Sequence, residues 1–155
     1  MRQDFQGIDI TVISVGVNDF SNGKRLGKLP ISTATTHAHS FIGDYCTALD
    51  YIYRSNPQMK VLLMTPLHRN TLHRAGKGPV NTIDSVVGGN VLKDFADAIK
   101  AIGSFYGCPV ADMYAESGLN RFNLPKITFE GVHPTNEGYR FIAAPLIEAM
   151  KKLDF

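Results

Sequence analysis

The chain has 155 residues and a mass of 17.0 kDa, enough for one domain with a sizeable hydrophobic core. Charged residues make up 19% of the sequence and the formal net charge is +2, so nothing in the composition favours nucleic-acid binding. No apolar run is long enough to span a membrane, and the first ten residues lack the apolar stretch of a signal peptide. The sequence leaves the location in the cell open.

Strand-like and helix-like segments alternate along the chain. Three short apolar runs are typical of strands that are covered on both faces, as in parallel sheets: Ile8–Val15, Lys60–Thr65 and Cys108–Met113. Apolar residues at helical spacing predict three helices, over His39–Arg54, Asn81–Tyr106 and Thr135–Leu153. This alternation predicts a single α/β domain over residues 1–155 with a parallel sheet.

Several residues predict where these helices begin and end. Asn56 and Pro57 stop the first helix, and Gly107 is placed to end the second. Thr135 is the expected N-cap of the third helix, and Pro145 should kink that helix or remove one of its hydrogen bonds.

Three long loops should lie beyond the carboxyl ends of the strands, where function gathers in open α/β sheets. They are Gly16–Ala38, Pro66–Val80 and Tyr114–Pro134. These loops contain every histidine except His39, which lies at the edge of one. We therefore expect the functional residues to come from these loops.

Two motifs in these loops suggest a family. The first strand ends in Gly16-Val17-Asn18-Asp19, and the last loop carries Glu130-Gly131-Val132-His133-Pro134. Together, and in this order, they resemble the SGNH (GDSL-type) hydrolases, which are esterases and acylhydrolases. The stretches KVLLMTPLHRN and VADMYAESGLN extend the resemblance over nearly the whole chain. It implies a flavodoxin-like three-layer α/β/α fold, here with a truncated sheet of about three strands.

The resemblance implies a role for each motif residue. His133 would be the general base that deprotonates the nucleophile and then protonates the leaving group. The side-chain amide of Asn18 would donate to the oxyanion, because acyl transfer develops negative charge on the former carbonyl oxygen. Gly16 would allow the tight turn before Asn18, and Asp19 would hydrogen-bond the loop.

Glu130 departs from the family pattern, in which the acid three residues before the histidine is usually aspartate. A carboxylate there can hold a ring nitrogen of His133 and fix its tautomer. Glutamate is one methylene longer, so its carboxylate must fold back or the loop must shift.

The family's nucleophile, a serine in a Gly-Asp-Ser motif on an earlier strand, is missing from this sequence. Gly43-Asp44-Tyr45 falls inside a predicted helix and has tyrosine in place of serine. Ser14, Ser21 and Ser32 do not lie in a nucleophile-elbow motif. We expect the serine to come from polypeptide beyond this chain, and the isolated chain to be inactive or nearly so.

The missing strand would pair beside Ile8–Val15, so this apolar strand should form an open sheet edge. We expect either a homo-oligomer through that strand or a precursor with about 50–70 further residues upstream.

Three further readings concern ligands. A pseudoenzyme or binding module would keep the cavity without the reaction. A metal site is an alternative suggested by four histidines, His37, His39, His68 and His73. Acidic residues at metal-ligand spacing are missing, and Cys46 and Cys108 match no zinc or redox spacing, so we expect no metal and no other cofactor.

The basic stretch His68–Lys77, which begins with His68 and Arg69, suggests contact with an anionic or carbohydrate-like substrate. A solvated loop would have the same composition. We expect the partner to be a small ester or an acylated carbohydrate, whose identity the sequence does not specify.

Overall fold

The computed structural model describes residues 5–29, 39–70 and 85–153. A parallel sheet with the strand order β1-β2-β3 forms its centre, with β1 at Ile10–Ser14, β2 at Lys60–Met64 and β3 at Val110–Ala111. All five residues of β1 pair in register with β2. The predicted α/β class with a short parallel sheet is therefore confirmed.

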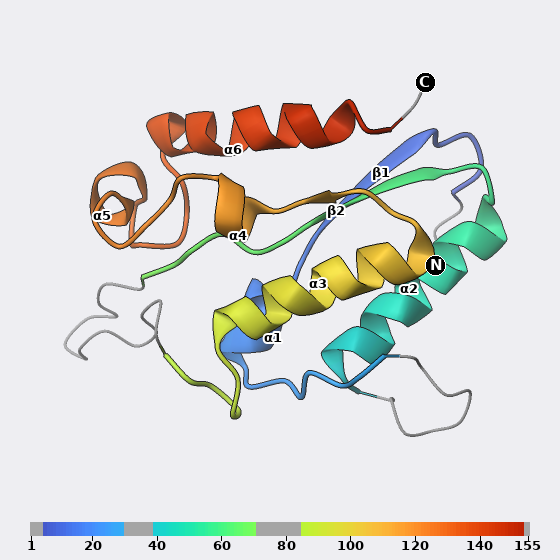
Figure 1. The fold of residues 1–155 in the computed structure, drawn as a ribbon, viewed down its shortest axis with the longest axis horizontal. Helices are drawn as coiled ribbons and strands as arrows, with labels where there is room; N and C mark the ends of the chain where they lie inside the picture. The colour runs from blue at the N-terminus through green and yellow to red at the C-terminus, as the bar shows by residue number, and fades with distance from the viewer. Residues whose placement is uncertain (1–4, 30–38, 71–84, 154–155) are drawn as a thin grey trace.

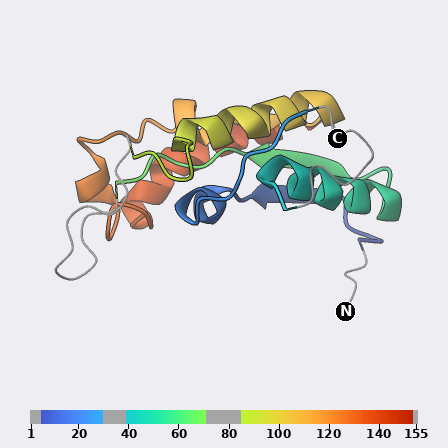
Figure 2. The same cartoon turned by 90° about the horizontal axis from the view of Figure 1, so that it is seen from below.

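Helices lie on both faces of this sheet (Figure 1). α2 (Phe41–Ser55) and α3 (Leu92–Tyr106) lie side by side on one face, as Figure 2 shows from below. α6 (Asn136–Met150) covers the other face. Three short helices complete the chain, α1 at Val17–Ser21, α4 at Met113–Glu116 and α5 at Leu124–Ile127. None of the helices in the described ranges is both long enough and apolar enough to cross a membrane.

β2 is buried on both faces, which explains why its sequence is a continuous apolar run. Side chains alternate across a strand, so Val61 and Leu63 pack among the residues of α2 and α3, and Leu62 packs against α6. All three side chains are at most 2% exposed. Two hydrophobic cores thus share one central strand.

The predicted helix ends are largely confirmed. Asn56 is the C-cap of α2, and Gly107 ends α3 in the left-handed conformation with φ 69°. The hydroxyl of Thr135 accepts a hydrogen bond from the amide of Gly138 at 3.2 Å and caps α6. α6 continues through Pro145 without interruption.

The sequence predicted a helix from Asn81 to Tyr106. Within the described residues this start was wrong, because α3 begins only at Leu92. Residues 81–84 lie outside the described residues. Gly88 and Gly89 have φ values of 58° and 80°, which form a turn that no right-handed helix can contain. The carboxylate of Asp94 then accepts from the amide of Val91 at 2.8 Å and fixes the helix start.

The third predicted strand is also shorter than expected, since β3 has only two residues. Asp112 ends it by capping α4, and Met113 is the first residue of that helix. The alternating apolar pattern of the predicted strand therefore continues into a helical turn, where Met113 is still buried.

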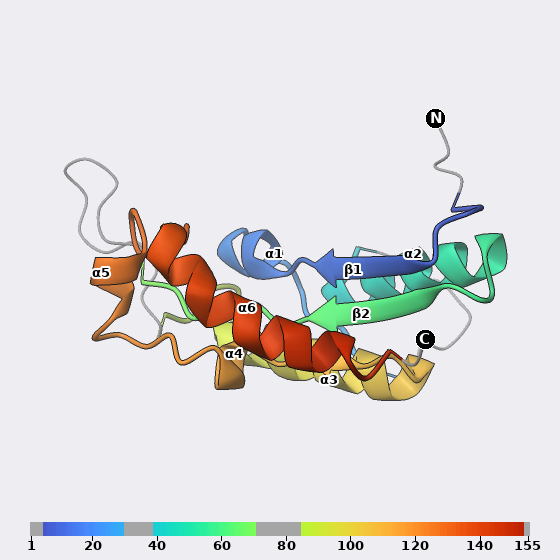
Figure 3. The same cartoon turned by 90° about the horizontal axis from the view of Figure 1, so that it is seen from above.

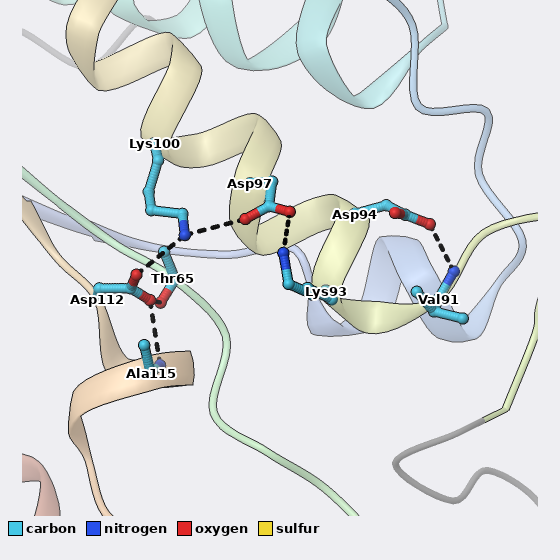
Figure 4. Close-up of polar contacts among 8 residues, drawn as sticks. All are labelled: Thr65, Val91, Lys93, Asp94, Asp97, Lys100, Asp112 and Ala115. Atoms are coloured by element: carbon cyan, nitrogen blue, oxygen red, sulfur yellow. Dashed lines mark hydrogen bonds and ion pairs between the residues drawn. The ribbon is translucent and has the colours of Figure 1, made fainter.

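Asp112 connects three elements (Figure 4). Its carboxylate accepts from the Thr65 hydroxyl at the end of β2 at 3.0 Å and from the Ala115 amide of α4 at 3.2 Å. It also pairs with Lys100 of α3 at 3.1 Å. The side chain of Asp112 is only 15% exposed, and its hydrogen bond to Thr65 is partly buried.

We predict that Asp112→Ala lowers the free energy of unfolding by about 1–3 kcal/mol, because it removes a helix cap and leaves the buried Thr65 hydroxyl without its acceptor. Asp97→Ala is the matched control: Asp97 pairs with Lys93 and Lys100 on an exposed helix face, so its loss should cost about 0–1 kcal/mol. Urea unfolding of both variants checks this. Equal losses would contradict it.

Candidate active site

A cavity of about 420 Å³ lies at the carboxyl ends of β1 and β2. Figure 3 shows α1 and the first turns of α6 at the same end of the sheet. The walls of the cavity come from four segments: residues 14–19, 64–69 and 132–134, and the α6 residues Tyr139 and Ile142. Asn18 and His133, far apart in the sequence, both line it.

Asn18 is placed by the sharp turn at Gly16. Gly16 has φ 115°, and a Cβ there would lie 3.2 Å from the ring of Phe41, so only glycine fits without strain. The chain then enters α1, a helix that the sequence did not predict, and Asn18 is its second residue. The side chain of Asn18 is exposed and makes no hydrogen bond to any described residue. Its amide can therefore donate to a ligand in the cavity.

The next residue, Asp19, is also part of the cavity wall, but its carboxylate is held in an ion pair. Its carboxylate pairs with Lys24 at 3.0 Å, and Lys24 also pairs with Asp44 of α2 at 2.8 Å. These two hydrogen bonds raise the pKa of Lys24, and the bond to Asp44 has the larger effect. Asp19 thus connects α1 to α2.

Residues 128–134, called the His133 loop below, are held together by hydrogen bonds within the loop. The amide of Phe129 donates to the carbonyl of His133 at 2.9 Å, and the hydroxyl of Thr128 accepts from the amide of Gly131 at 3.0 Å. Gly131 has φ 81°, which reverses the chain direction. This reversal brings Glu130 opposite His133.

Glu130 and His133 form a hydrogen-bonded pair between Oε1 and Nδ1. The longer glutamate side chain therefore reaches the ring from within this loop. A proton on Nδ1 that is donated to the carboxylate leaves Nε2 as the acceptor. The side chain of His133 is 77% exposed, so Nε2 is open to a reactant at the rim of the cavity.

His68 forms part of the cavity wall. Its ring lies on Tyr114, with ring centroids 4.0 Å apart. Burial lowers the pKa of His68, which keeps the ring neutral near pH 7. Its Nδ1 is buried and has no hydrogen-bond partner in the described ranges.

Arg69 also lines the cavity, and it is only 8% exposed. Its Nη1 donates to the Ser21 hydroxyl and, at 3.5 Å, to the carbonyl of Val17, both in α1. Burial lowers the pKa of its guanidinium. Both residues of the predicted substrate pocket are thus in the wall, and their contact with a substrate stays a prediction.

Sequence reasoning missed two features of the cavity. The first predicted strand extends to Val15, but β1 ends at Ser14, whose exposed side chain lines the cavity. Most of the remaining wall is apolar, and its members are Val15, Val17, Met64, Pro66, Leu67, Val132, Pro134, Tyr139 and Ile142. These residues show no common sequence signal, because they come from separate elements.

The metal interpretation rests on four histidines, of which His37 and His73 lie outside the described residues. Within residues 5–29, 39–70 and 85–153, no group of three or more His, Cys, Asp or Glu side chains could hold a metal ion.

The parallel sheet, with a histidine–carboxylate pair at its carboxyl edge, defines an α/β protein with a candidate site at that edge. A family model narrows this class: the GDSL-like lipase/acylhydrolase model matches residues 2–141. The chain belongs to this family. No curated protein sequence is a significant match.

Solved structures share the fold. A possible lipase from Chitinophaga pinensis is 22% identical, with a TM-score of 0.75 over 94% of this chain and 73% of its own. A protein from Lactobacillus plantarum is 22% identical, with a TM-score of 0.78 over 97% of this chain and 72% of its own. A GDSL-like lipase from Bacteroides thetaiotaomicron is 19% identical, with a TM-score of 0.52 over 91% of this chain and 61% of its own. This chain is therefore shorter than each of them.

The lowered pKa of His68 predicts a pH-dependent stability. Below a pH of about 6.5, unfolded chains bind a proton on His68 that the native state binds less readily, so the free energy of unfolding should fall as the pH drops from about 7.5 to about 5. His68→Phe keeps an aromatic ring on Tyr114 but cannot titrate. We expect a smaller loss of stability over this range in the variant, measured by urea unfolding. Identical losses in both proteins would contradict the burial of a neutral His68.

Proposed function

We propose that this chain supplies the acid–base and oxyanion part of an ester hydrolase site. The observation that carries the proposal is that Asn18 and His133 line one cavity, with Glu130 bonded to the histidine. Membership of the GDSL-like lipase/acylhydrolase family supports the same reaction class.

In the proposed reaction, a hydroxyl attacks the carbonyl carbon of an ester while Nε2 of His133 accepts the hydroxyl proton. The carboxylate of Glu130 holds Nδ1–H and stabilises the imidazolium that forms. The amide of Asn18 donates to the oxyanion of the tetrahedral intermediate. The imidazolium then protonates the leaving alcohol, and an acyl group remains on the attacking oxygen.

Under the proposal, the attacking serine does not come from this chain. The sequence has no Gly-Asp-Ser, and Gly43-Asp44-Tyr45 lies within α2, where Tyr45 is only 4% exposed. A serine carried by other polypeptide would complete the site. Without it, His133 can only activate water, which is a weaker nucleophile in this geometry.

The cavity favours an ester with an apolar acyl group. Its volume lies within the range of about 300–1,000 Å³ that is typical of small-molecule sites, and its walls are mostly apolar. His68 and Arg69 add polar groups on one side, which suits a small ester or an acylated carbohydrate.

Residual ester hydrolysis tests the proposal. We expect slow hydrolysis of a p-nitrophenyl ester by the wild type, at most about 1,000- to 10,000-fold above the uncatalysed rate and without a burst. His133→Ala should reduce it to background, and Asn18→Ala should reduce it by about tenfold or more, because one oxyanion donor is lost. His39→Ala, which alters an exposed histidine outside the cavity, is the matched control.

Two outcomes would contradict the proposal. If His133→Ala and the wild type hydrolyse the ester equally, the cavity only binds ligands, as in a pseudoenzyme. A burst that disappears in Ser14→Ala would place the nucleophile on this chain.

As the alternative to a further strand that carries the serine, we propose that β1 pairs with β1 of a second copy of the chain. Within the described part, β2 is the only strand that pairs with β1, and β1 contains no charge and no proline to protect its free edge. Val12 and Val15 are 42% and 49% exposed, and β1 lies clear of α6 in Figure 3. A two-fold axis at this edge would satisfy the same backbone groups on both copies.

Sedimentation velocity tests this pairing. We expect the wild type to form a species of twice the chain mass, and Val12→Lys to be monomeric, because two lysines would meet at the edge. Val86→Lys, at a 67% exposed position away from β1, should still dimerise. A wild type that stays monomeric at all concentrations would rule out the pairing.

A further inference from the structure

Arg69 is a buried cation in the wall of the candidate active site. It is only 8% exposed, and its Nη1 donates to the hydroxyl of Ser21 and to the carbonyl of Val17. The Ser21 hydroxyl in turn donates to the Val17 carbonyl at 2.8 Å. Arg69 therefore bonds to both ends of α1.

α1 needs such contacts because it has only five residues. Isolated helices shorter than about 12–15 residues are marginal in water, so tertiary contacts must hold this one. Its N-cap, Gly16, offers no side chain to bond the first amides. On one side the helix is held by Phe20, which is fully buried against Phe95. On the cavity side, Arg69 bonds to it.

The residue after Arg69 is bonded to the other half of the site. The backbone amide of Asn70 donates to the carbonyl of Gly131 at 2.8 Å, and Gly131 lies between Glu130 and His133. Two consecutive residues thus join the helix that carries Asn18 to the loop that carries His133.

We propose that Arg69 is a positioning residue: its guanidinium holds α1 so that Asn18 stays at a fixed place relative to His133. This inference rests on the proposed hydrolase function. Burying a cation costs several kcal/mol before its hydrogen bonds compensate, and an apolar side chain of similar length would avoid that cost. The gain from arginine is geometric, because Nη1 of its rigid, planar guanidinium bonds two acceptors of one helix in a set orientation.

Three substitutions separate this role from simple packing. Arg69→Met keeps the aliphatic stem and removes the donors, Arg69→Lys keeps a cation with different geometry, and Ser21→Ala removes one acceptor on α1. Arg54→Met is the matched control, because Arg54 is 82% exposed on α2, where it pairs with Asp50 at 3.6 Å. Circular dichroism and thermal unfolding verify that each variant folds.

The first readout is amide hydrogen exchange in α1. The amides of Phe20 and Asn22 donate to the carbonyls of Gly16 and Asn18. In Arg69→Met their exchange should be at least about tenfold faster, because hydrogen bonds from a charged donor are lost, with little change in α3. Ser21→Ala should have a smaller effect in the same direction, and Arg54→Met none.

The second readout is the slow ester hydrolysis. A positioning role predicts that Arg69→Met lowers kcat by about tenfold with KM changed less than about twofold, because Asn18 acts in the transition state. Arg69→Lys should recover part of kcat. A raised KM with unchanged kcat would overturn the proposal, since Arg69 would then bind the substrate.

The two readouts also separate this inference from the proposed function. If no protein hydrolyses the ester, the hydrolase proposal fails, and exchange in α1 alone decides whether Arg69 holds the helix. Unchanged α1 exchange in Arg69→Met overturns the inference whatever the activity. If Arg69→Met does not fold, the same comparison is made between Arg69→Lys, Ser21→Ala and wild type.

Discussion

The chain segment from Thr65 to Asn70, just after β2, is the constraint on which the candidate site depends. Thr65 donates to Asp112 and accepts from the amide of Tyr114 at 2.9 Å, and the ring of His68 lies on Tyr114. Arg69 and Asn70 then bond to α1 and to the His133 loop. Because β2 itself is buried on both faces, this segment begins from a closely packed strand and transmits its position to both motifs.

The same segment contains an unusual amount of buried polarity. Nδ1 of His68 and Oδ1 of Asn70 are buried without hydrogen-bond partners among the residues that the structure describes. Each such group costs about 1–3 kcal/mol, so a segment selected only for stability would avoid them. Both atoms belong to residues beside the cavity. We infer that the arrangement of polar groups at this site lowers the stability of the fold.

The open edge of the sheet and the cavity are one continuous surface. Val15 is half exposed at the end of β1 and also lines the cavity, as does Ser14 beside it. Within the described residues no strand but β2 pairs with β1, and a strand added to its other edge would begin or end at the side of the sheet where the cavity lies. Under the proposed function, a strand that completes the sheet would also lie beside the candidate site.

Local patterns in the sequence determined the strands, the helix caps at Asn56, Gly107 and Thr135, and the two motifs that contain Asn18 and His133. These are properties of residue type and of short-range periodicity, so no other part of the chain is needed to recognise them. The tertiary structure alone decided that α1 exists and that Arg69 bonds to it. Those features depend on contacts between residues far apart in the chain, and a five-residue helix has no stability of its own from which a local pattern could predict it.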